Sequence, residues 1–418
     1  MKLRMNSRVL LRALIGLPFF LMIGCATSKV AGASSPQSLR SAIIFIPGFY
    51  GSALKDKRSG DRFFISASQY IFGSKAVSLH VTELATPDSP DLEVDGVLEG
   101  VRLIPGLYTY DVYGKFLRTL QDYATETHQE LIPFAYDWRQ DLSEDAKRLE
   151  QTVDDLHARG IQEVKIVAHS LGCLITTYYL AYGAQEPENA ILNWSGALKI
   201  QRAVLMAGPY RGAFSLFRNM QTGATIGGNR TFMPAETVAS LPSSYQLLPF
   251  PDFHLLKMNG DKTSLPLDDF QTWKSLQLGL FHAQTLSPQV QERRVDYVDH
   301  QLKRAAAFSR DIQLPHNLVA PPPRSLKVLQ LVGSGHPVVD SAFWDATKDG
   351  FFFDTDPIEK LKLAKSSLFL DGDGSVTVRS AQLPPALEPN AKVLHSTLVH
   401  EKIFEDEIFQ KELREFLR

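Results

Sequence analysis

Residues 164–182 place an apolar strand-like run, a turn of small residues and an apolar helix-like run directly one after another. The mostly apolar run Val164–Ala168 predicts a strand, and the length and composition of Leu171–Tyr182 predict a helix. Small residues stand at positions 168 and 172, on either side of Ser170. Larger side chains there would clash in the strained turn that exposes a serine hydroxyl. The pattern therefore predicts that Ser170 is presented between a strand and a helix.

Strand-like and helix-like segments alternate along much of the remaining chain. Apolar runs predict further strands from Ser41 and over residues 131–136, 200–206 and 325–332. Helical spacing of apolar residues predicts helices over residues 111–127, 142–158 and 401–417. This alternation is typical of a mainly parallel sheet with helices on both faces. For a chain of 418 residues we expect one elaborated domain, and two separate domains are the alternative.

The alternation stops between about residues 210 and 323, where glycines, prolines and mixed helical stretches end in three consecutive prolines. We expect this region to be a cap inserted into the sheet, because long insertions at the functional end of a sheet are commonly lids. A loosely packed structural insertion is the alternative. The glycines between Gly223 and Gly228 would suit a hinge, although ordinary turns need glycine as well.

The amino-terminal stretch has the features of a secretion signal. Basic residues precede an uncharged run from Ala13 to Gly24, which is too short to span a membrane and ends at Cys25. Residues 21–25 resemble a bacterial lipobox, with Met22 in place of the usual leucine. We therefore predict a lipoprotein signal peptide over residues 1–24, acylation of Cys25 and a tether over residues 25–38. A cleaved signal peptide with a coincidental cysteine is the alternative.

This interpretation predicts a lipid-anchored protein of the bacterial cell envelope, on the periplasmic or outer surface, whose folded part covers residues 39–418. The formal net charge of the chain is −2, and removing the basic signal peptide leaves the mature protein more acidic. We therefore expect no nucleic-acid partner. With Cys25 acylated, Cys173 is the only other thiol, so an intrachain disulfide is excluded. We expect Cys173 to be a buried, inert residue.

The turn at Ser170 approximates the Gly-x-Ser-x-Gly nucleophile elbow of α/β-hydrolases, with Ala168 in place of the first glycine. The helix that follows would place the backbone N–H of Leu171 as one donor to an oxyanion. In this architecture a second donor comes from the loop after an early strand, here Pro47-Gly48-Phe49, so the Phe49 N–H is the candidate. A plain turn is the alternative for that loop.

A serine hydroxyl needs a base to activate it and a carboxylate to orient that base, and in this fold the acid precedes the histidine. Asp371 and Asp373 lie in a glycine-rich turn, and only His395 and His400 follow it. We favour His400 because it directly precedes the last helix, whereas His395 ends a strand. The later ligands of a calcium loop are absent, so we expect no metal, and no cofactor is predicted. His169 is expected to be structural.

Several motifs in this chain resemble those of the lecithin:cholesterol acyltransferase family, which has the α/β-hydrolase fold. The matching segments are Ile46-Pro47-Gly48, Tyr136-Asp137-Trp138-Arg139, Ala207 to Gly212, Ser243 to Pro249 and Asp371 to Val376. The resemblance implies a nucleophile at Ser170, an acid at Asp373 and a base at His400, with Phe49 and Leu171 as oxyanion donors. The motif at residues 136–139 would brace the loop beneath the site, and Arg139 facing a lipid headgroup is the alternative.

Animal members of this family carry a disulfide-held membrane-binding segment, which this chain cannot form in that way. Its counterpart would be the apolar segment Asp61–Val77, a second means of reaching a membrane surface. The expected reaction is serine-dependent acyl transfer from ester bonds of phospholipids or related lipids. Water as acceptor would make the protein a lipase or phospholipase, and an alcohol would make it an O-acyltransferase. The alternative is a non-catalytic lipid-binding envelope lipoprotein with the same fold.

Overall fold

Six parallel strands form the central sheet of the computed structural model. The structure describes residues 40–64, 91–104, 108–226, 229–250, 253–257, 261–282, 288–314, 320–345, 350–352 and 368–418. The strands lie in the order β7 (Glu130–Pro133), β1 (Ser41–Ile46), β8 (Glu163–His169), β9 (Arg202–Met206), β14 (Lys327–Gly333) and β19 (Ala391–Ser396). The predicted mainly parallel sheet is confirmed.

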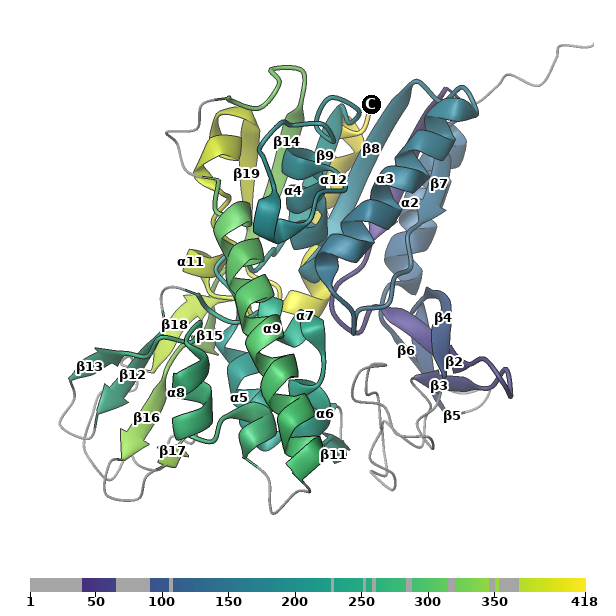
Figure 1. The fold of residues 1–418 in the computed structure, drawn as a ribbon. Coiled ribbons are helices and arrows are strands. Elements are labelled where there is room, and N and C mark those ends of the chain that lie inside the picture. The colour runs from purple at the N-terminus through teal and green to yellow at the C-terminus, as the bar shows by residue number, and fades with distance from the viewer. Residues whose placement is uncertain are drawn as a thin grey trace, which may run out of the picture. The chain divides into compact units, whose positions relative to one another are not determined.

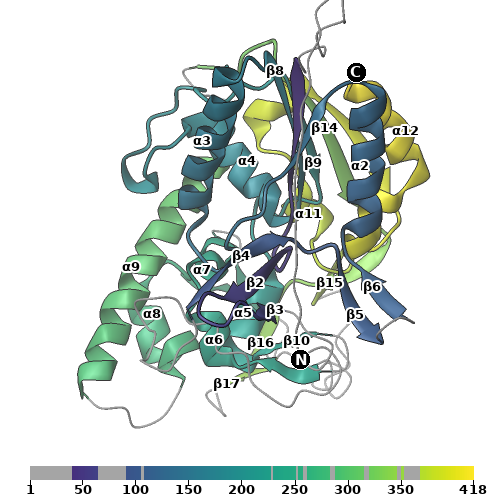
Figure 2. The ribbon, with the colours of Figure 1, turned by 90° about the vertical axis from the view of Figure 1, so that its right-hand side faces the viewer.

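Helices cover both faces of this sheet, as predicted (Figure 2). Helices α3 (Leu142–Ala158) and α4 (Leu171–Tyr182) lie on one face, and α2 (Gly114–Glu126) and α12 (Glu407–Phe416) lie on the other. Alternate residues of β1 enter the two cores: Ile44 packs in the core with α3 and α4, and Phe45 packs in the core with α2 and α12. Burial on both faces explains why these strands are continuous apolar runs.

The order of the strands reverses between β1 and β8. The chain passes from β1 to β7 at one side, then crosses over β1 to reach β8, and continues outward to β9 and β14. Crevices at the carboxyl ends of strands form at such a reversal, and ligands bind there in open α/β sheets. The loop after β1 and the turn after β8 meet at this point, so the sheet topology brings Phe49 and Ser170 to the same place.

The carboxyl-terminal helix is shorter than predicted. A 3₁₀ helix, η6 (His400–Glu405), comes first, and α12 begins only after Asp406. The Asp406 carboxylate accepts the backbone N–H of Phe409 at 3.0 Å and the hydroxyl of Ser396 at 2.8 Å. This N-cap ends the first helical segment and starts the second, although the apolar spacing continues through both.

Smaller elements surround the carboxyl ends of the sheet strands, in the lower half of the view in Figure 1. Those before the main helices are β2 (Ser52–Asp56), β3 (Arg62–Phe64), β4 (Leu92–Val97), β5 (Gly100–Ile104) and β6 (Tyr108–Asp111). The range predicted to form a cap, residues 210–323, contains α5 (Phe214–Thr222), β10 (Ala224–Ile226), β11 (Asn229–Met233), α6 (Ala235–Ala239), α7 (Pro242–Gln246), β12 (His254–Lys257), β13 (Lys262–Ser264), α8 (Phe270–Ser275), η3 (Gly279–Phe281) and α9 (Pro288–Ile312). Short 3₁₀ helices η2 (Pro187–Asn189) and η5 (Pro385–Asn390) and the helix α11 (Val378–Ala381) lie elsewhere in the chain.

The cap draws on a second stretch of chain as well. After β14 the chain forms β15 (His336–Val339), β16 (Ala342–Asp345), β17 (Gly350–Phe352) and β18 (Phe369–Gly372). Strand β12 pairs in parallel with β16, which pairs with β17, so the order of the cap sheet is β13-β12-β16-β17. Residues beyond the predicted range 210–323 therefore belong to the same layer.

Leu39–Arg418 is a compact unit by itself, and residues 1–39 lie outside the described residues. The predicted signal peptide, the tether and Cys25 therefore stay predictions. Across the described ranges, no helix combines the length and the apolar character needed to cross a bilayer. Of the segment 61–77, only residues 61–64 are described, and Phe64 is buried against Trp138 rather than exposed. Phe64 therefore belongs to the core and offers no membrane-binding surface.

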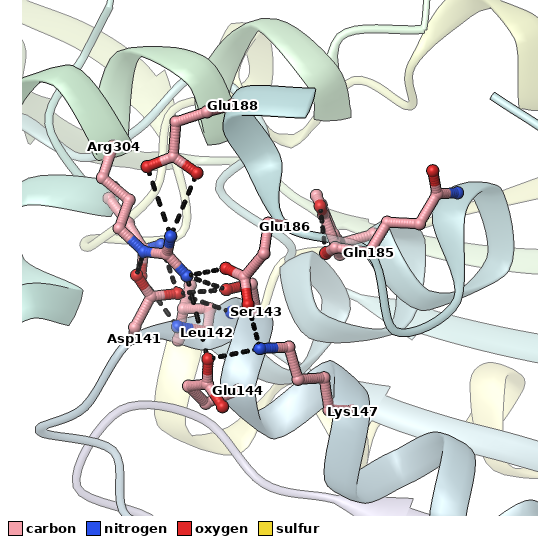
Figure 3. Close-up of polar contacts among 11 residues, drawn as sticks. Asp141, Leu142, Ser143, Glu144, Lys147, Gln185, Glu186, Glu188 and Arg304 are labelled. Carbon is pink, nitrogen blue, oxygen red and sulfur yellow. Dashed lines mark hydrogen bonds and ion pairs between the residues drawn. The ribbon is translucent and has the colours of Figure 1, made fainter. Parts of the chain in front are cut away.

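An arginine of the cap helix α9 is bonded to the rest of the domain through several acceptors (Figure 3). Arg304 binds the carboxylate of Asp141, which is the N-cap of α3, and donates to Glu186 at 2.6 Å and to Glu188 at 3.0 Å. It also donates to the hydroxyl of Ser143 at 2.7 Å. The Arg304 and Asp141 side chains are 13% and 12% exposed, so their ion pair is poorly screened by water, whereas Glu186 and Glu188 are 46% and 38% exposed.

Replacing Arg304 by Met should lower the free energy of unfolding by about 2 kcal/mol, because it leaves Asp141 and Glu186 close together without their shared cation. Urea denaturation near pH 7 measures this change. The matched control is Lys303→Met on the same helix, where the side chain is 71% exposed and pairs only within the helix with Asp299. That change should cost less than about 0.5 kcal/mol. Equal effects of the two substitutions would contradict a role for Arg304 in holding the cap.

Candidate active site

Ser170 lies in a strained turn between β8 and α4. Its backbone has φ 53° and ψ −120°, a left-handed conformation that a side chain rarely adopts, and its N–H donates to the Met206 carbonyl at 2.8 Å. The turn is held tightly against the loop after β1. A Cβ at Gly172 would lie 2.6 Å from the carbonyl oxygen of Ile46 and 2.8 Å from that of Pro47, so only glycine fits there. The steric reason for a small residue at position 172 is therefore visible in the structure.

The structure brings His400 and Asp373 to Ser170. The Nε2 atom of His400 lies 2.9 Å from the Ser170 Oγ, and its Nδ1 atom lies 2.7 Å from the Asp373 Oδ2. All three residues are buried, with 9%, 9% and 1% exposure for Ser170, His400 and Asp373. A hydroxyl, an imidazole and a carboxylate in this order can transfer a proton from the serine while the carboxylate holds the imidazole in one tautomer.

Two backbone contacts fix Asp373 in this position. Its Oδ1 atom accepts the N–H groups of Ser375 at 2.9 Å and Val376 at 2.7 Å, which leaves Oδ2 for His400. The Asp373 carbonyl also accepts the His400 backbone N–H at 2.9 Å. Asp371 is exposed, and its Oδ1 instead accepts the Gly335 N–H at 2.7 Å. The neighbouring aspartates therefore have separate roles.

The alternative base, His395, lies on the edge strand β19 with an exposed side chain. Burial alone would lower the pKa of His400, but the carboxylate of Asp373 outweighs this and raises the pKa above its ordinary value of 6.5. Burial alone would also raise the pKa of Asp373, while His400 and the backbone N–H groups lower it below its usual range. The pair therefore favours an ionised Asp373 and stabilises a protonated His400 once a proton has moved.

The loop after β1 is braced by the motif at residues 136–139. The hydroxyl of Tyr136 donates to the Pro47 carbonyl at 2.9 Å, and the indole N–H of Trp138 donates to the Ser52 carbonyl at 3.1 Å. The ring of Trp138 also packs against that of Phe49, with the ring centres 5.3 Å apart. Arg139 is buried and forms a two-point ion pair with Asp137. These contacts favour the bracing role over recognition of a headgroup by Arg139.

A cavity of about 610 Å³ opens at Ser170 and His400. Phe49 lines it from the loop after β1, while Leu171 is the buried first residue of α4, directly beside Ser170. The cap contributes apolar walls through Leu216 and Leu247. Polar wall residues are Asp111, Ser215, Asn219, Thr225 and Glu401. A cavity of this size and mixed lining suits a ligand that has both an apolar chain and a polar group.

Among the residues that line the cavity without having been predicted from the sequence are Tyr113, at the start of α2, and Leu216, in α5. Their places depend on how α2 and α5 dock against the sheet, for which the local sequence carries no motif. Cys173 is buried behind Ser170, where burial raises the pKa of its thiol, so it has the inert character predicted for it. Within the described ranges, no group of three or more His, Cys, Asp or Glu side chains is arranged to hold a metal ion.

The family model described as lecithin:cholesterol acyltransferase matches residues 94–407. No curated protein sequence matches the chain.

A similar solved structure is that of the Tle4–Tli4 complex, with 12% identity over 90% of this chain and 98% of the other, and a TM-score of 0.51. The mature lipase BlEst2 of Bacillus licheniformis has 12% identity over 92% and 94% of the two chains, with a TM-score of 0.34. The lin2722 gene product of Listeria innocua has 14% identity over 91% and 94%, with a TM-score of 0.31. The fold is that of the α/β-hydrolases.

The raised pKa of His400 predicts how kcat/KM depends on pH in the acidic range. Ester hydrolysis needs neutral His400, so kcat/KM should fall as the pH drops through an apparent pKa above 6.5. In Asp373→Asn the remaining burial lowers the His400 pKa, so this limb should move below 6.5 while kcat falls by about 10⁴-fold. Rates on a soluble ester between pH 5 and 9 measure both effects. Asp371→Asn is the matched control and should leave the limb in place; a shift in this variant instead would assign the acid to Asp371.

Proposed function

Because the chain belongs to the lecithin:cholesterol acyltransferase family, we propose that it is a serine-dependent acyl hydrolase or acyltransferase acting on ester bonds of phospholipids or related lipids. The observation that carries this proposal is the hydrogen-bonded series Ser170, His400 and Asp373 at the cavity of about 610 Å³. A protein that only binds lipid has no need of a serine in a strained turn with a base at 2.9 Å. This favours catalysis over the non-catalytic alternative.

In the proposed mechanism, the Nε2 atom of His400 takes the hydroxyl proton of Ser170 as the Ser170 Oγ attacks the ester carbonyl carbon. The carbonyl oxygen becomes an oxyanion, which the backbone N–H groups of Phe49 and Leu171 stabilise. Protonated His400 then gives its proton to the leaving alcohol as the ester C–O bond breaks. The acyl group stays on Ser170, and Asp373 stabilises the charged imidazole throughout.

The acceptor in the second half of the reaction decides the product. Neutral His400 takes a proton from the acceptor as the acceptor oxygen attacks the acyl carbon. Protonated His400 then returns this proton to the Ser170 Oγ as the bond between Oγ and the acyl carbon breaks. Water gives a free fatty acid, and an alcohol bound in the same cavity gives a new ester. Analysis of the products from defined phospholipids and neutral esters, with and without an added alcohol, separates these reactions.

Replacing Ser170 by Ala should abolish covalent labelling by a serine-directed phosphonate and lower turnover by several orders of magnitude, with the fold retained. His400→Ala should act in the same way, because the two residues form one unit. His395→Ala is the matched control and should keep both labelling and turnover, since its side chain is exposed on β19. Lipid binding without labelling or turnover in the parent would instead identify a non-catalytic lipid-binding protein.

We also propose that the mature protein is anchored to the bacterial cell envelope through an acylated Cys25, which the charged and apolar pattern of residues 1–25 supports. Cys25→Ser should shift the protein from the detergent phase to the aqueous phase in a detergent partition experiment. Intact mass of the parent should show cleavage before Cys25 and two or more added acyl chains. An unmodified Cys25, or cleavage at another position, would contradict the anchor.

A further inference from the structure

A chain of buried hydrogen bonds runs behind the candidate active site. The backbone N–H of Gly48 lies 2.9 Å from the hydroxyl oxygen of Tyr113, which lies 2.7 Å from the Nδ1 atom of His169. The Nε2 atom of His169 lies 3.1 Å from the carbonyl oxygen of His400. This chain connects the loop after β1 to the backbone of the base, two parts of the site that are far apart in sequence.

Each hydrogen bond in this series has a defined donor and acceptor. The Gly48 N–H can only donate and the His400 carbonyl can only accept, so Tyr113 accepts from Gly48 and His169 donates through Nε2. Burial, followed by the nearby His400, lowers the pKa of His169 to about 3, so its ring is neutral and carries one proton. With that proton on Nε2, the Nδ1 atom accepts, and the Tyr113 hydroxyl donates to it. Tyr113 and His169 therefore satisfy both of their neighbours without conflict.

The two ends of this series of hydrogen bonds, at Gly48 and His400, are the parts of the site that need accurate placement. Gly48 precedes Phe49, the proposed oxyanion donor, and a Cβ at Gly48 would lie only 2.8 Å from the Cβ of Ser170. Since its N–H is already used by Tyr113, Gly48 itself is not the donor. At the other end, His169 holds the His400 carbonyl while the Asp373 carbonyl holds the His400 N–H. The backbone of the base is thus held on both sides.

We propose that Tyr113 and His169 are positioning residues, which fix the oxyanion loop and the base of the proposed acyl-transfer site relative to each other. The inference rests on the proposed function and assigns a role to two residues whose hydrogen bonds reach the backbone of the site, at the Gly48 N–H and the His400 carbonyl. Packing alone does not require the polar atoms, because the ring of Tyr113 already contacts Phe45 and Phe404, with ring centres 5.2 and 5.4 Å apart. A phenylalanine would keep these ring contacts and lose only the hydroxyl.

Tyr113→Phe tests the proposal when active sites are counted by phosphonate titration and turnover is expressed per titrated site. We expect kcat per site to fall by about 10- to 100-fold with KM changed less than about twofold, because a displaced oxyanion donor weakens the transition state more than the bound substrate. A merely structural role would lower the number of titratable sites and leave kcat per site unchanged. That result would overturn the proposal.

The matched control is Tyr182→Phe, which removes another buried tyrosine hydroxyl, bonded to the Asp311 carbonyl at 3.1 Å at the far end of α4. Its kcat per site should equal that of the parent. A second variant, His169→Leu, removes both ring nitrogens and so loses the acceptor for Tyr113 and the donor to the His400 carbonyl. The double variant Tyr113→Phe with His169→Leu should lose no more activity than the less active of the two single variants, because both break the same chain of hydrogen bonds.

Additive losses in the double variant would overturn the proposed coupling. The same data separate this inference from the function on which it rests. A parent that is neither labelled nor active overturns the acyl-transfer proposal and the positioning role together. A labelled, active parent with an unaltered Tyr113→Phe variant overturns the positioning role only.

Discussion

The close approach of two backbone segments, the turn after β8 and the loop after β1, determines what the rest of this structure can do. Gly172 lies so near the carbonyl oxygens of Ile46 and Pro47 that no side chain fits between them. The same contact brings the loop after β1 to Ser170, whose left-handed backbone costs roughly 1–3 kcal/mol. The Ser170 N–H bond to Met206 and the burial of α4 along its whole length offset that cost.

The rest of the site is added to this contact from the carboxyl-terminal half of the chain. His400 begins the 3₁₀ helix η6 and Asp373 follows β18, and the two residues are bonded to each other through their backbones as well as their side chains beside Ser170. The motif around Tyr136 and Trp138 supports the opposite side by holding the carbonyls of Pro47 and Ser52. The Ser170, His400 and Asp373 residues are therefore each held by backbone contacts as well as by hydrogen bonds between their side chains.

The sequence was most informative where the residues that a structural feature requires are consecutive in the chain. Ser170 was predictable because the small residues beside it, the apolar strand before it and the helix after it are all consecutive. The motif around Asp373 and the histidine His400 emerged from chain order and family resemblance, since no local pattern distinguishes Asp371 from Asp373. Burial of Phe64 could not be anticipated, because an apolar run suits a core and a membrane surface equally.

Other features depend on contacts between distant segments. The break at Asp406 was hidden because apolar spacing continues across it, although an aspartate followed by Glu407 is an N-cap signal. The proposed role of Tyr113 depends on two hydrogen-bond partners from two distant segments, the loop after β1 and the end of β8, so neither composition nor spacing points to it. The contribution of residues after β14 to the cap was missed for the same reason, since β16 joins the cap sheet only through its pairing with the distant strand β12.

That shared cap sheet restricts how a bulky lipid can reach the serine. The chain leaves the central sheet after β9 and again after β14, and the two excursions join through the pairing of β12 with β16. A flap attached at one place can rotate freely about a single hinge, whereas a body attached at two places loses most of that freedom. A glycine hinge near Gly223 would therefore release only local elements such as α5 and β10. Any opening of the cap that keeps the pairing of β12 with β16 therefore moves these two strands together.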